Sequence, residues 1–294
     1  MTRLAILSDM HGNLPALEAV LSDLSQFKID RVIVPGDVIN WGPFSAQVVD
    51  RVAREGWAVI RGNNEFYLLD YDTPRAPEAW TDRNHFSMLP WLAGQLNGRR
   101  HDIIATWPDT LHLRFPDAPP IRVVHGSPRS NREPIYPISA EADVEAMLAG
   151  VEETTVIAGH THLAMDRCVG RWHILNPGSI GVPIDGRPGA SYMLLEGNES
   201  GWHATIRRAD FDDAPLFAEF ERQNFIEECG VIAHLVLEEF KTHRLHIHPF
   251  VHWRSACRPD AAVDMNLLAE FKQIDPWPYI PPAFHVNLPG LAGF

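Results

Sequence analysis

The sequence predicts an α/β protein in which a largely parallel β-sheet is covered by helices and a helical segment follows. Two observations predict this class. From Leu4 to Ile60, short apolar runs alternate with stretches of helical periodicity, and polar residues follow each apolar run. This is the pattern of parallel strands joined by helices. Beyond about Arg208 the strand signals give way to helical apolar faces.

The N-terminal elements read as β-α-β-α-β. Apolar or β-branched runs predict strands at Leu4–Leu7, Arg31–Val34 and Trp57–Ile60. Pro15 is suited to open the first helix, and Gln47–Arg54 carries the pattern of the second. Ligands of open α/β sheets bind outside the carboxyl ends of the strands. The polar residues that follow these strands are therefore candidate functional residues.

The middle of the chain is less regular. Helices are expected around 65–69 and 84–95, and strand signals return beyond residue 110. The later strands are expected at Leu111–Phe115, Ile121–His125, Val156–Ala158, Trp172–Leu175, Ser191–Leu195 and Trp202–Arg208.

The C-terminal part has helical character. Helices are expected at Leu216–Glu228, Val231–Glu239 and Asp264–Ile274, before an irregular arm rich in proline and aromatic residues. We therefore expect two units, 1–208 and 209–294. The second is a helical extension that either caps the cleft or pairs subunits.

Four histidines crowd one segment of this extension, and they have two interpretations. Strand alternation would place His246 and His248 on one face. A second metal site is the alternative, although no carboxylate or cysteine accompanies the histidines. The four residues are His243, His246, His248 and His252.

Composition excludes several classes of protein. The formal net charge is −13 over 294 residues, which argues against binding long nucleic acid, because that requires Lys/Arg patches. The three cysteines are widely spaced and odd in number, so a disulfide framework is not expected. No signal segment is evident, and no apolar run approaches the ~20 residues that span a bilayer. We expect a cytoplasmic protein with no membrane association.

Five short clusters of metal-ligand residues each follow a predicted strand. Any one of them alone is weak evidence, but all five in this order are unlikely to coincide by chance. A glycine in or beside each cluster allows the backbone to approach the site closely. The clusters are Asp9-Met10-His11, Gly36-Asp37, Gly62-Asn63-Asn64-Glu65, His125-Gly126-Ser127 and Gly159-His160-Thr161-His162.

In these clusters the sequence resembles the calcineurin-like metallophosphoesterase superfamily, over roughly residues 3–195. The superfamily pattern is D-x-H, G-D, G-N-x-[ED], H and G-H-x-H. The chain is most similar to the small bacterial and archaeal phosphodiesterase branch, which includes diadenosine polyphosphate hydrolases. It shares with that branch Gly36–Pro43, His125–Pro128 and Asn176–Ser179. The resemblance implies an α/β metallophosphoesterase sandwich of two mixed β-sheets flanked by helices.

The resemblance also implies a pair of metal ions. The first would be held by Asp9, His11, Asp37 and His162. The second would be held by Asp37, Asn63, His125 and His160, so that Asp37 bridges the two. Mixed imidazole and carboxylate ligands favour transition metals over calcium or magnesium. We expect two divalent ions, foremost manganese, with iron, zinc, nickel or cobalt as alternatives.

The expected reaction is attack of a metal-bridging hydroxide on phosphorus. Many members of the superfamily carry a histidine after the metal-binding asparagine, as a leaving-group acid, where this chain has Asn64. A neutral amide cannot act as that acid, so either the substrate has a good leaving group or the acid comes from elsewhere. Glu65 is read as a helix-start or supporting residue.

Three further positions are candidates around the reaction centre. Arg61 could contact a substrate phosphate, or could be a surface-paired arginine at the end of a strand. Asn40 could hydrogen-bond the substrate. Arg129 and Arg132 could guide an anion, although such residues more often belong to a solvated loop.

The predicted function is hydrolysis of a phosphodiester or phosphoanhydride in a small, nucleotide-like substrate. The catalytic residues would be Asp37, Asn64 and Arg61, with Asn40 binding substrate. Two alternatives remain open: a protein serine/threonine phosphatase, and a non-catalytic metal- or nucleotide-binding protein. A homodimer is also compatible with the sequence.

Overall fold

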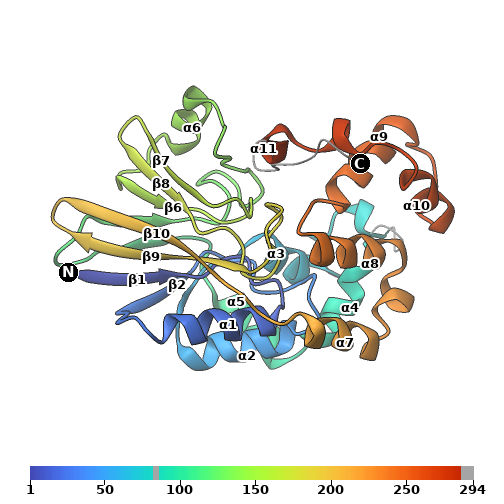
Figure 1. Ribbon diagram of the computed structural model, residues 1–294, viewed down its shortest axis with the longest axis horizontal. Helices are drawn as coiled ribbons and strands as arrows, with labels where there is room; N and C mark the ends of the chain where they lie inside the picture. The colour runs from blue at the N-terminus through green and yellow to red at the C-terminus, as the bar shows by residue number, and fades with distance from the viewer. Residues whose placement is uncertain (82–85, 286–294) are drawn as a thin grey trace.

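The computed structural model of the protein describes residues 1–81 and 86–285. Two five-stranded sheets lie face to face, and helices gather around them and at one end (Figure 1). This confirms the predicted sandwich of two mixed sheets flanked by helices. Residues 84 and 85, at the start of one expected helix, lie outside the described ranges; the helix itself is observed over Met88–Gln95.

The first sheet has the strand order β10-β9-β1-β2-β3. Strands β1, β2 and β3 are parallel, whereas β9 is antiparallel to both β1 and β10. The strands are β1 (Thr2–Ile6), β2 (Arg31–Val34), β3 (Ala58–Val59), β9 (Ala190–Asn198) and β10 (Gly201–Ala209).

The second sheet has the strand order β4-β5-β6-β8-β7. Its three central strands are parallel, and the two edge strands are antiparallel to their neighbours. The edge strand β7 was not expected from the sequence, because its buried and exposed residues do not form an apolar run. The strands are β4 (Leu111–Leu113), β5 (Ile121–Val123), β6 (Thr155–Ile157), β7 (Met165–Val169) and β8 (Trp172–Asn176).

Side-chain alternation along β1 explains how the layers pack. Leu4 and Ile6 point into the core between the two sheets, whereas Ala5 and Leu7 pack beneath the helices on the outer face. Burial of one such leucine or isoleucine contributes about 1.5–3 kcal/mol. The helices that lie between the strands in sequence are α1 (Leu14–Leu24), α2 (Ser45–Glu55), α3 (Asn63–Asp70), η1 (Glu78–Thr81), α4 (Met88–Gln95), α5 (Arg99–Thr106) and α6 (Glu141–Leu148).

The C-terminal helices gather at one end of the sandwich (Figure 1). Their apolar side chains form a cluster that also includes Met88, Leu163, Val182 and Ile184. The break predicted between residues 228 and 231 is a kink inside α8, where Gly230 has φ 57°. The first of these helices instead ends at Arg222, and the next begins at Phe225. The elements are α7 (Ala214–Arg222), α8 (Phe225–Thr242), α9 (Ile247–Cys257), α10 (Met265–Phe271), η2 (Trp277–Tyr279) and α11 (Pro282–His285).

The strand expected in the histidine-rich segment is wrong. Residues from Ile247 onward form the helix α9, because Glu239 accepts hydrogen bonds from the backbone N–H groups of His246 and Ile247 and so caps its N-terminus. His248 and His252 are one turn apart on this helix, with ring centroids 3.9 Å apart.

Within residues 1–81 and 86–285, no helix combines the length and the apolar character needed to cross a bilayer.

Candidate metal centre

The carboxyl ends of the parallel strands meet at one edge of the sandwich, and all seven predicted metal ligands lie there. Asp9 and His11 follow β1, Asp37 follows β2, and Asn63 opens α3 directly after β3. His125 follows β5 in the second sheet. His160 and His162 follow β6. The two sheets therefore face each other with ligands on both sides of one cleft.

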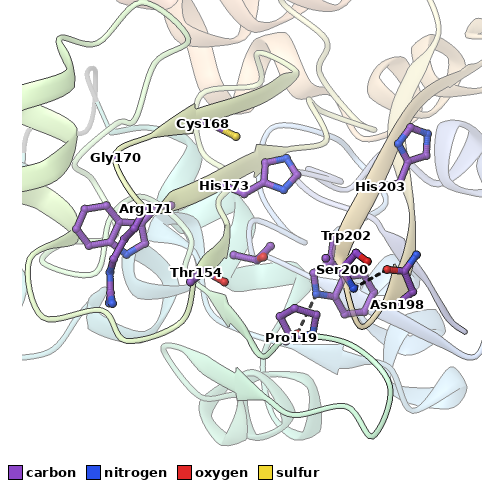
Figure 2. Close-up of a pocket in the computed structure, with 13 residues that line it drawn as sticks. Pro119, Thr154, Cys168, Gly170, Arg171, His173, Asn198, Ser200, Trp202 and His203 are labelled. Atoms are coloured by element: carbon purple, nitrogen blue, oxygen red, sulfur yellow. Dashed lines mark hydrogen bonds between the residues drawn. The ribbon is translucent and has the colours of Figure 1, made fainter.

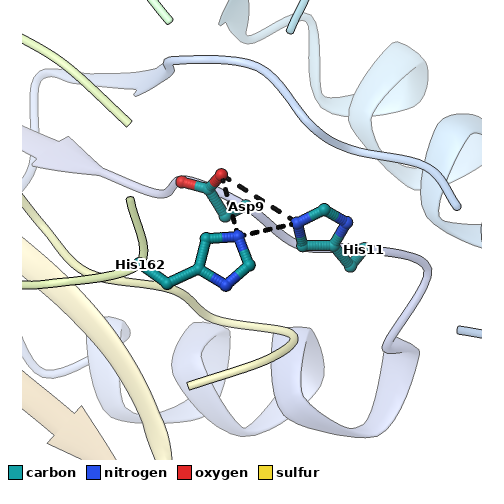
Figure 3. A group of neighbouring side chains, drawn as sticks. All are labelled: Asp9, His11 and His162. Atoms are coloured by element: carbon teal, nitrogen blue, oxygen red, sulfur yellow. Dashed lines mark hydrogen bonds and ion pairs between the residues drawn. The ribbon is translucent and has the colours of Figure 1, made fainter. Parts of the chain in front are cut away.

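Asp9, His11 and His162 form the first group of converging ligand atoms (Figure 3). The Nε2 atoms of His11 and His162 are 2.9 Å apart. The Asp9 Oδ1 atom lies 3.4 Å from His162 Nε2 and 4.0 Å from His11 Nε2. All three side chains are buried.

Asp37, His125 and His160 form the second group. Asp37 Oδ2 lies 3.2 Å from His125 Nε2 and 3.7 Å from His11 Nε2, so it faces both groups. The Asn63 Oδ1 atom is 3.0 Å from His125 Nε2 and completes this side. The geometry places Asp37 between two sets of ligand atoms.

The residues present are suited to divalent cations. Asp9 and Asp37 are buried carboxylates, and within the described residues the only basic side chains within 4.0 Å of them are histidines, with no lysine or arginine. Buried carboxylates without a cationic partner are costly, and bound cations would remove that cost. The nitrogen and oxygen donors suit transition metals.

Two backbone carbonyls orient the imidazoles. His125 Nδ1 donates to the Pro35 carbonyl oxygen, and His162 Nδ1 donates to that of Val182, both at 2.7 Å. With Nδ1 carrying the proton, the Nε2 lone pair of each ring is directed into the site, as metal-binding histidines require.

Charges within the site shift the pKa values of its groups. Burial would raise the pKa values of Asp9 and Asp37, but the neighbouring histidines hold both below their ordinary range. Burial lowers the pKa values of His11 and His160 to about 4. Burial acts likewise on His125, yet Asp37 outweighs it and raises the pKa of His125 to about 9. A cation that binds there must displace this proton.

The backbone of the site is strained. Several ligand residues adopt left-handed φ values, which are uncommon for side chains other than glycine. Such conformations cost of order 1–3 kcal/mol each and concentrate at functional sites. The ligand residues with positive φ are Asp9 (53°), His11 (46°), Asp37 (51°), His160 (68°) and His162 (57°).

Asn64 and Asn40 form a hydrogen-bonded chain that ends on Asp37. The Asn64 amide donates to Asp37 Oδ2 at 2.6 Å, and its backbone N–H donates to Oδ1 at 2.9 Å. The Asn40 amide donates to Asn64 Oδ1 at 2.6 Å. Among residues 1–81 and 86–285, the buried Oδ1 of Asn40 has no hydrogen-bond partner.

Glu65 joins the loop after β2 to the start of α3. Its buried carboxylate accepts backbone N–H groups from Asp37 (3.0 Å), Val38 (2.9 Å), Ile39 (3.3 Å) and Gly62 (2.6 Å). Burial and the charge of Asp37 raise the pKa of Glu65 to about 7, while these N–H groups oppose the rise. Glu65 therefore holds the Asp37 loop against the start of α3, as expected of a supporting residue.

The Arg61 side chain is engaged by two neighbouring residues, Asp109 and Phe66. Its guanidinium lies 2.6 Å from Asp109 Oδ1 and stacks over the ring of Phe66 at 5.0 Å. A contact between Arg61 and a substrate phosphate would require breaking this pair.

Trp41 is a residue of the site that the sequence analysis missed. Its ring stacks on His11, with centroids 4.8 Å apart and planes 17° apart, and lies 5.8 Å from His162. Its position just before Gly42, in the loop that carries Asp37, is a signal that could have identified it.

A further cavity of about 430 Å³ lies at the opposite edge of the sheets (Figure 2). It is lined by residues where β6 and β8 begin, such as Thr155 and Trp172, and by the β9–β10 turn. Because the ligands follow the strand ends, this cavity is not part of the metal centre.

Comparisons with known proteins agree with this geometry. A model of the calcineurin-like phosphoesterase superfamily domain matches residues 2–200. Phosphodiesterase YfcE of Escherichia coli (strain K12) is 27% identical over 203 residues, covering 67% of this chain and 88% of that protein.

Two solved structures share the fold. A metallophosphoesterase from Sphaerobacter thermophilus aligns with a TM-score of 0.64 at 23% identity, over 82% of this chain and 100% of that one. The hypothetical protein PH1004 from Pyrococcus horikoshii OT3 aligns with a TM-score of 0.67 at 19% identity, over 80% and 98%. The chain belongs to the calcineurin-like phosphoesterase superfamily and is a hydrolase that acts on phosphoric ester bonds.

Proposed function

We propose that the chain hydrolyses a phosphodiester or phosphoanhydride in a small, nucleotide-like substrate. The observation that carries this proposal is the position of Asp37 between two buried groups of ligand atoms. The likeness to a protein named as a phosphodiesterase supports the diester chemistry.

In this proposal Asp9, His11, Asp37 and His162 hold one ion, and Asp37, Asn63, His125 and His160 hold the other. Manganese is the foremost expectation. Once bound, such a pair of ions supplies an activated water and stabilises charge on the phosphoryl oxygens. The protein's own part is to hold these donors in place, through the strained loops and the carbonyl contacts of His125 and His162.

Asn64 acts as a positioning residue in this account. Its side chain is fully engaged, donating to Asp37 and accepting from Asn40, and it has no acidic proton to give. A substrate whose leaving group departs without protonation is therefore preferred, such as a phosphoanhydride or an aryl-like diester. The unpaired Oδ1 of Asn40 favours a substrate hydroxyl or amine over a phosphate oxygen.

We propose further that the helical extension, 209–294, acts as a cap. Leu163 and Val182 lie in the same apolar cluster as Phe225 and Val236 of α8, and the Val182 carbonyl orients His162. A shift of α8 would therefore displace Val182 and, through its carbonyl group, the proposed metal ligand His162. The alternative role, pairing two subunits into a homodimer, would appear as a doubled mass in solution.

The test is hydrolysis of bis-para-nitrophenyl phosphate with and without Mn²⁺, by wild type and by Asp37→Asn. Mn²⁺-dependent turnover that is lost in Asp37→Asn would support the proposal. Absence of turnover with Mn²⁺, Ni²⁺, Co²⁺ and Zn²⁺ would contradict it.

A further inference from the structure

A cavity of about 550 Å³ adjoins the second ligand group, since His125 forms part of its wall. The loop 127–132 forms one side. The cavity contains several charged groups, and most are neutralised locally. Arg122 pairs with Glu153 at 3.0 Å, and Arg129 pairs with Glu133.

The acidic groups of the cavity are likewise engaged. Asp109 pairs with Arg61 and Asp70 pairs with Arg75, both at 2.6 Å. Arg132 differs from its neighbours. Within residues 1–81 and 86–285, no carboxylate lies within 4.0 Å of the Arg132 guanidinium. A cation at the wall of a cavity beside a phosphoesterase centre remains available for an anion.

Tyr67 holds this cation next to the metal ligands. The Arg132 guanidinium lies over the Tyr67 ring, 4.8 Å from its centroid, a cation–π contact. Tyr67 is one helical turn beyond Asn63 in α3. Burial raises the pKa of Tyr67, while the charge of Arg132 lowers it. The ring that carries Arg132 therefore belongs to the same helix as Asn63.

Hydrogen bonds within the loop 127–132 and to Glu133 also fix the loop's conformation. Ser127 donates its hydroxyl to Glu133, and its backbone N–H donates to the Ser130 carbonyl at 2.9 Å. The backbone N–H of Arg132 donates to Ser130 Oγ at 3.2 Å. A preorganised loop loses less entropy when it binds a ligand.

We propose that Arg132, seated on Tyr67, binds a second phosphate group of the substrate, adjacent to the phosphoryl group held at the metal centre. The preferred substrates then contain a pyrophosphate or longer oligophosphate unit, because the planar guanidinium matches phosphate oxygens in pairs. This inference rests on the proposed function and narrows it to phosphoanhydrides or to diesters that carry a further phosphate.

The experiment compares inorganic pyrophosphate with orthophosphate as inhibitors of bis-para-nitrophenyl phosphate hydrolysis, at fixed free Mn²⁺. The variants are Arg132→Ala, Arg132→Lys and the matched control Arg129→Ala, which removes a cation from the same loop that Glu133 already neutralises. Arg132→Ala should raise the inhibition constant of pyrophosphate about 10- to 100-fold. The constant for orthophosphate should rise much less.

Arg132→Lys should recover part of the affinity, because it keeps the charge and loses the planar stack. Equal weakening of pyrophosphate and orthophosphate, or equal effects of Arg132→Ala and Arg129→Ala, would overturn the inference.

Calorimetric titration of the Mn²⁺-loaded protein with pyrophosphate separates this inference from the proposed function. Should wild type fail to turn over the diester, a loss of pyrophosphate affinity confined to Arg132→Ala would still support the subsite. Unchanged affinity in Arg132→Ala would overturn the subsite even in an active enzyme.

Discussion

The carboxylate of Glu65 accepts a hydrogen bond from the backbone N–H of Asp37, at 3.0 Å. Glu65 is the third residue of a helix that begins at Asn63, whereas Asp37 lies at the end of a strand in another part of the chain. The same carboxylate binds the Gly62 N–H at 2.6 Å. One side chain therefore fixes the spacing between two of the proposed metal ligands, Asp37 and Asn63.

Replacing Glu65 by glutamine should weaken metal binding. The amide nitrogen cannot accept an N–H group, so at least one of the bonds to Asp37, Val38, Ile39 and Gly62 is lost. Loss of such a supporting contact typically costs about 10- to 100-fold in metal affinity. Titration with Mn²⁺ would measure it, with the exposed Glu152→Gln as control. Wild-type affinity in Glu65→Gln would contradict the positioning role.

Replacing Asn64 by alanine should lower turnover equally for good and poor leaving groups. Its side chain orients Asp37 and gives no proton to the substrate, so the identity of the leaving group should not matter. We expect kcat to fall about 10-fold, for aryl diesters with good and with poor leaving groups alike, because one charge-assisted hydrogen bond is lost. A loss that grows as the leaving group becomes more basic would instead make Asn64 part of leaving-group departure.

Gly62→Ala should disrupt the site through a steric clash. A Cβ at residue 62 would lie 2.2 Å from Asp37 Oδ1 and 2.6 Å from its backbone nitrogen. The helix and the Asp37 loop would have to move apart, and Mn²⁺ affinity should fall sharply. Gly94→Ala in α4 is the matched control, because nothing lies within 4 Å of its Cβ position. It should stabilise the fold by up to about 1 kcal/mol and leave metal binding intact.

Glu239→Gln should stabilise the metal-free protein at alkaline pH. Burial raises the pKa of Glu239 to about 7 from a reference of 4.5, although the N–H groups of His246 and Ile247 lower it. Below pH 4.5 the carboxyl is protonated in both folded and unfolded states, so glutamine brings little change. Between pH 4.5 and 7 the unfolded state ionises while the folded state keeps its proton, so wild type loses stability over this range, by roughly 3 kcal/mol once pH exceeds 7.

Thermal unfolding in a chelator, at pH 4.5 and pH 8, measures this difference. The melting temperature of Glu239→Gln should exceed that of wild type only at pH 8. An equal gain at both values would mean that the carboxyl stays ionised when buried.

The apolar runs, such as Arg31–Val34, predicted the first parallel strands well, whereas the sandwich of two sheets was expected from the family resemblance. The sequence placed all seven metal ligands at strand ends, where the structure brings them together. The histidine-rich segment was mispredicted because the cap that starts α9 comes from Glu239, a residue that is not adjacent in sequence. Pattern alone cannot reveal such a tertiary contact.

The relation of Arg132 to Tyr67 was equally hidden from the sequence. Both arginines after His125 look alike as residues of a solvated loop. Only the three-dimensional structure shows that Arg129 forms an ion pair with Glu133, whereas Arg132 lies over the ring of Tyr67. The same holds for Trp41, which stacks on His11 from a backbone conformation with a positive φ of 61°.

The central claim is that Asp37 lies between two metal ions, and a crystal structure with bound Mn²⁺ tests it most directly. Anomalous scattering should show two ions about 3.5–4 Å apart, one beside Asp9, His11 and His162 and the other beside Asn63, His125 and His160. Asp37 should contact both. A single ion, or ions bound away from Asp37, would contradict the account.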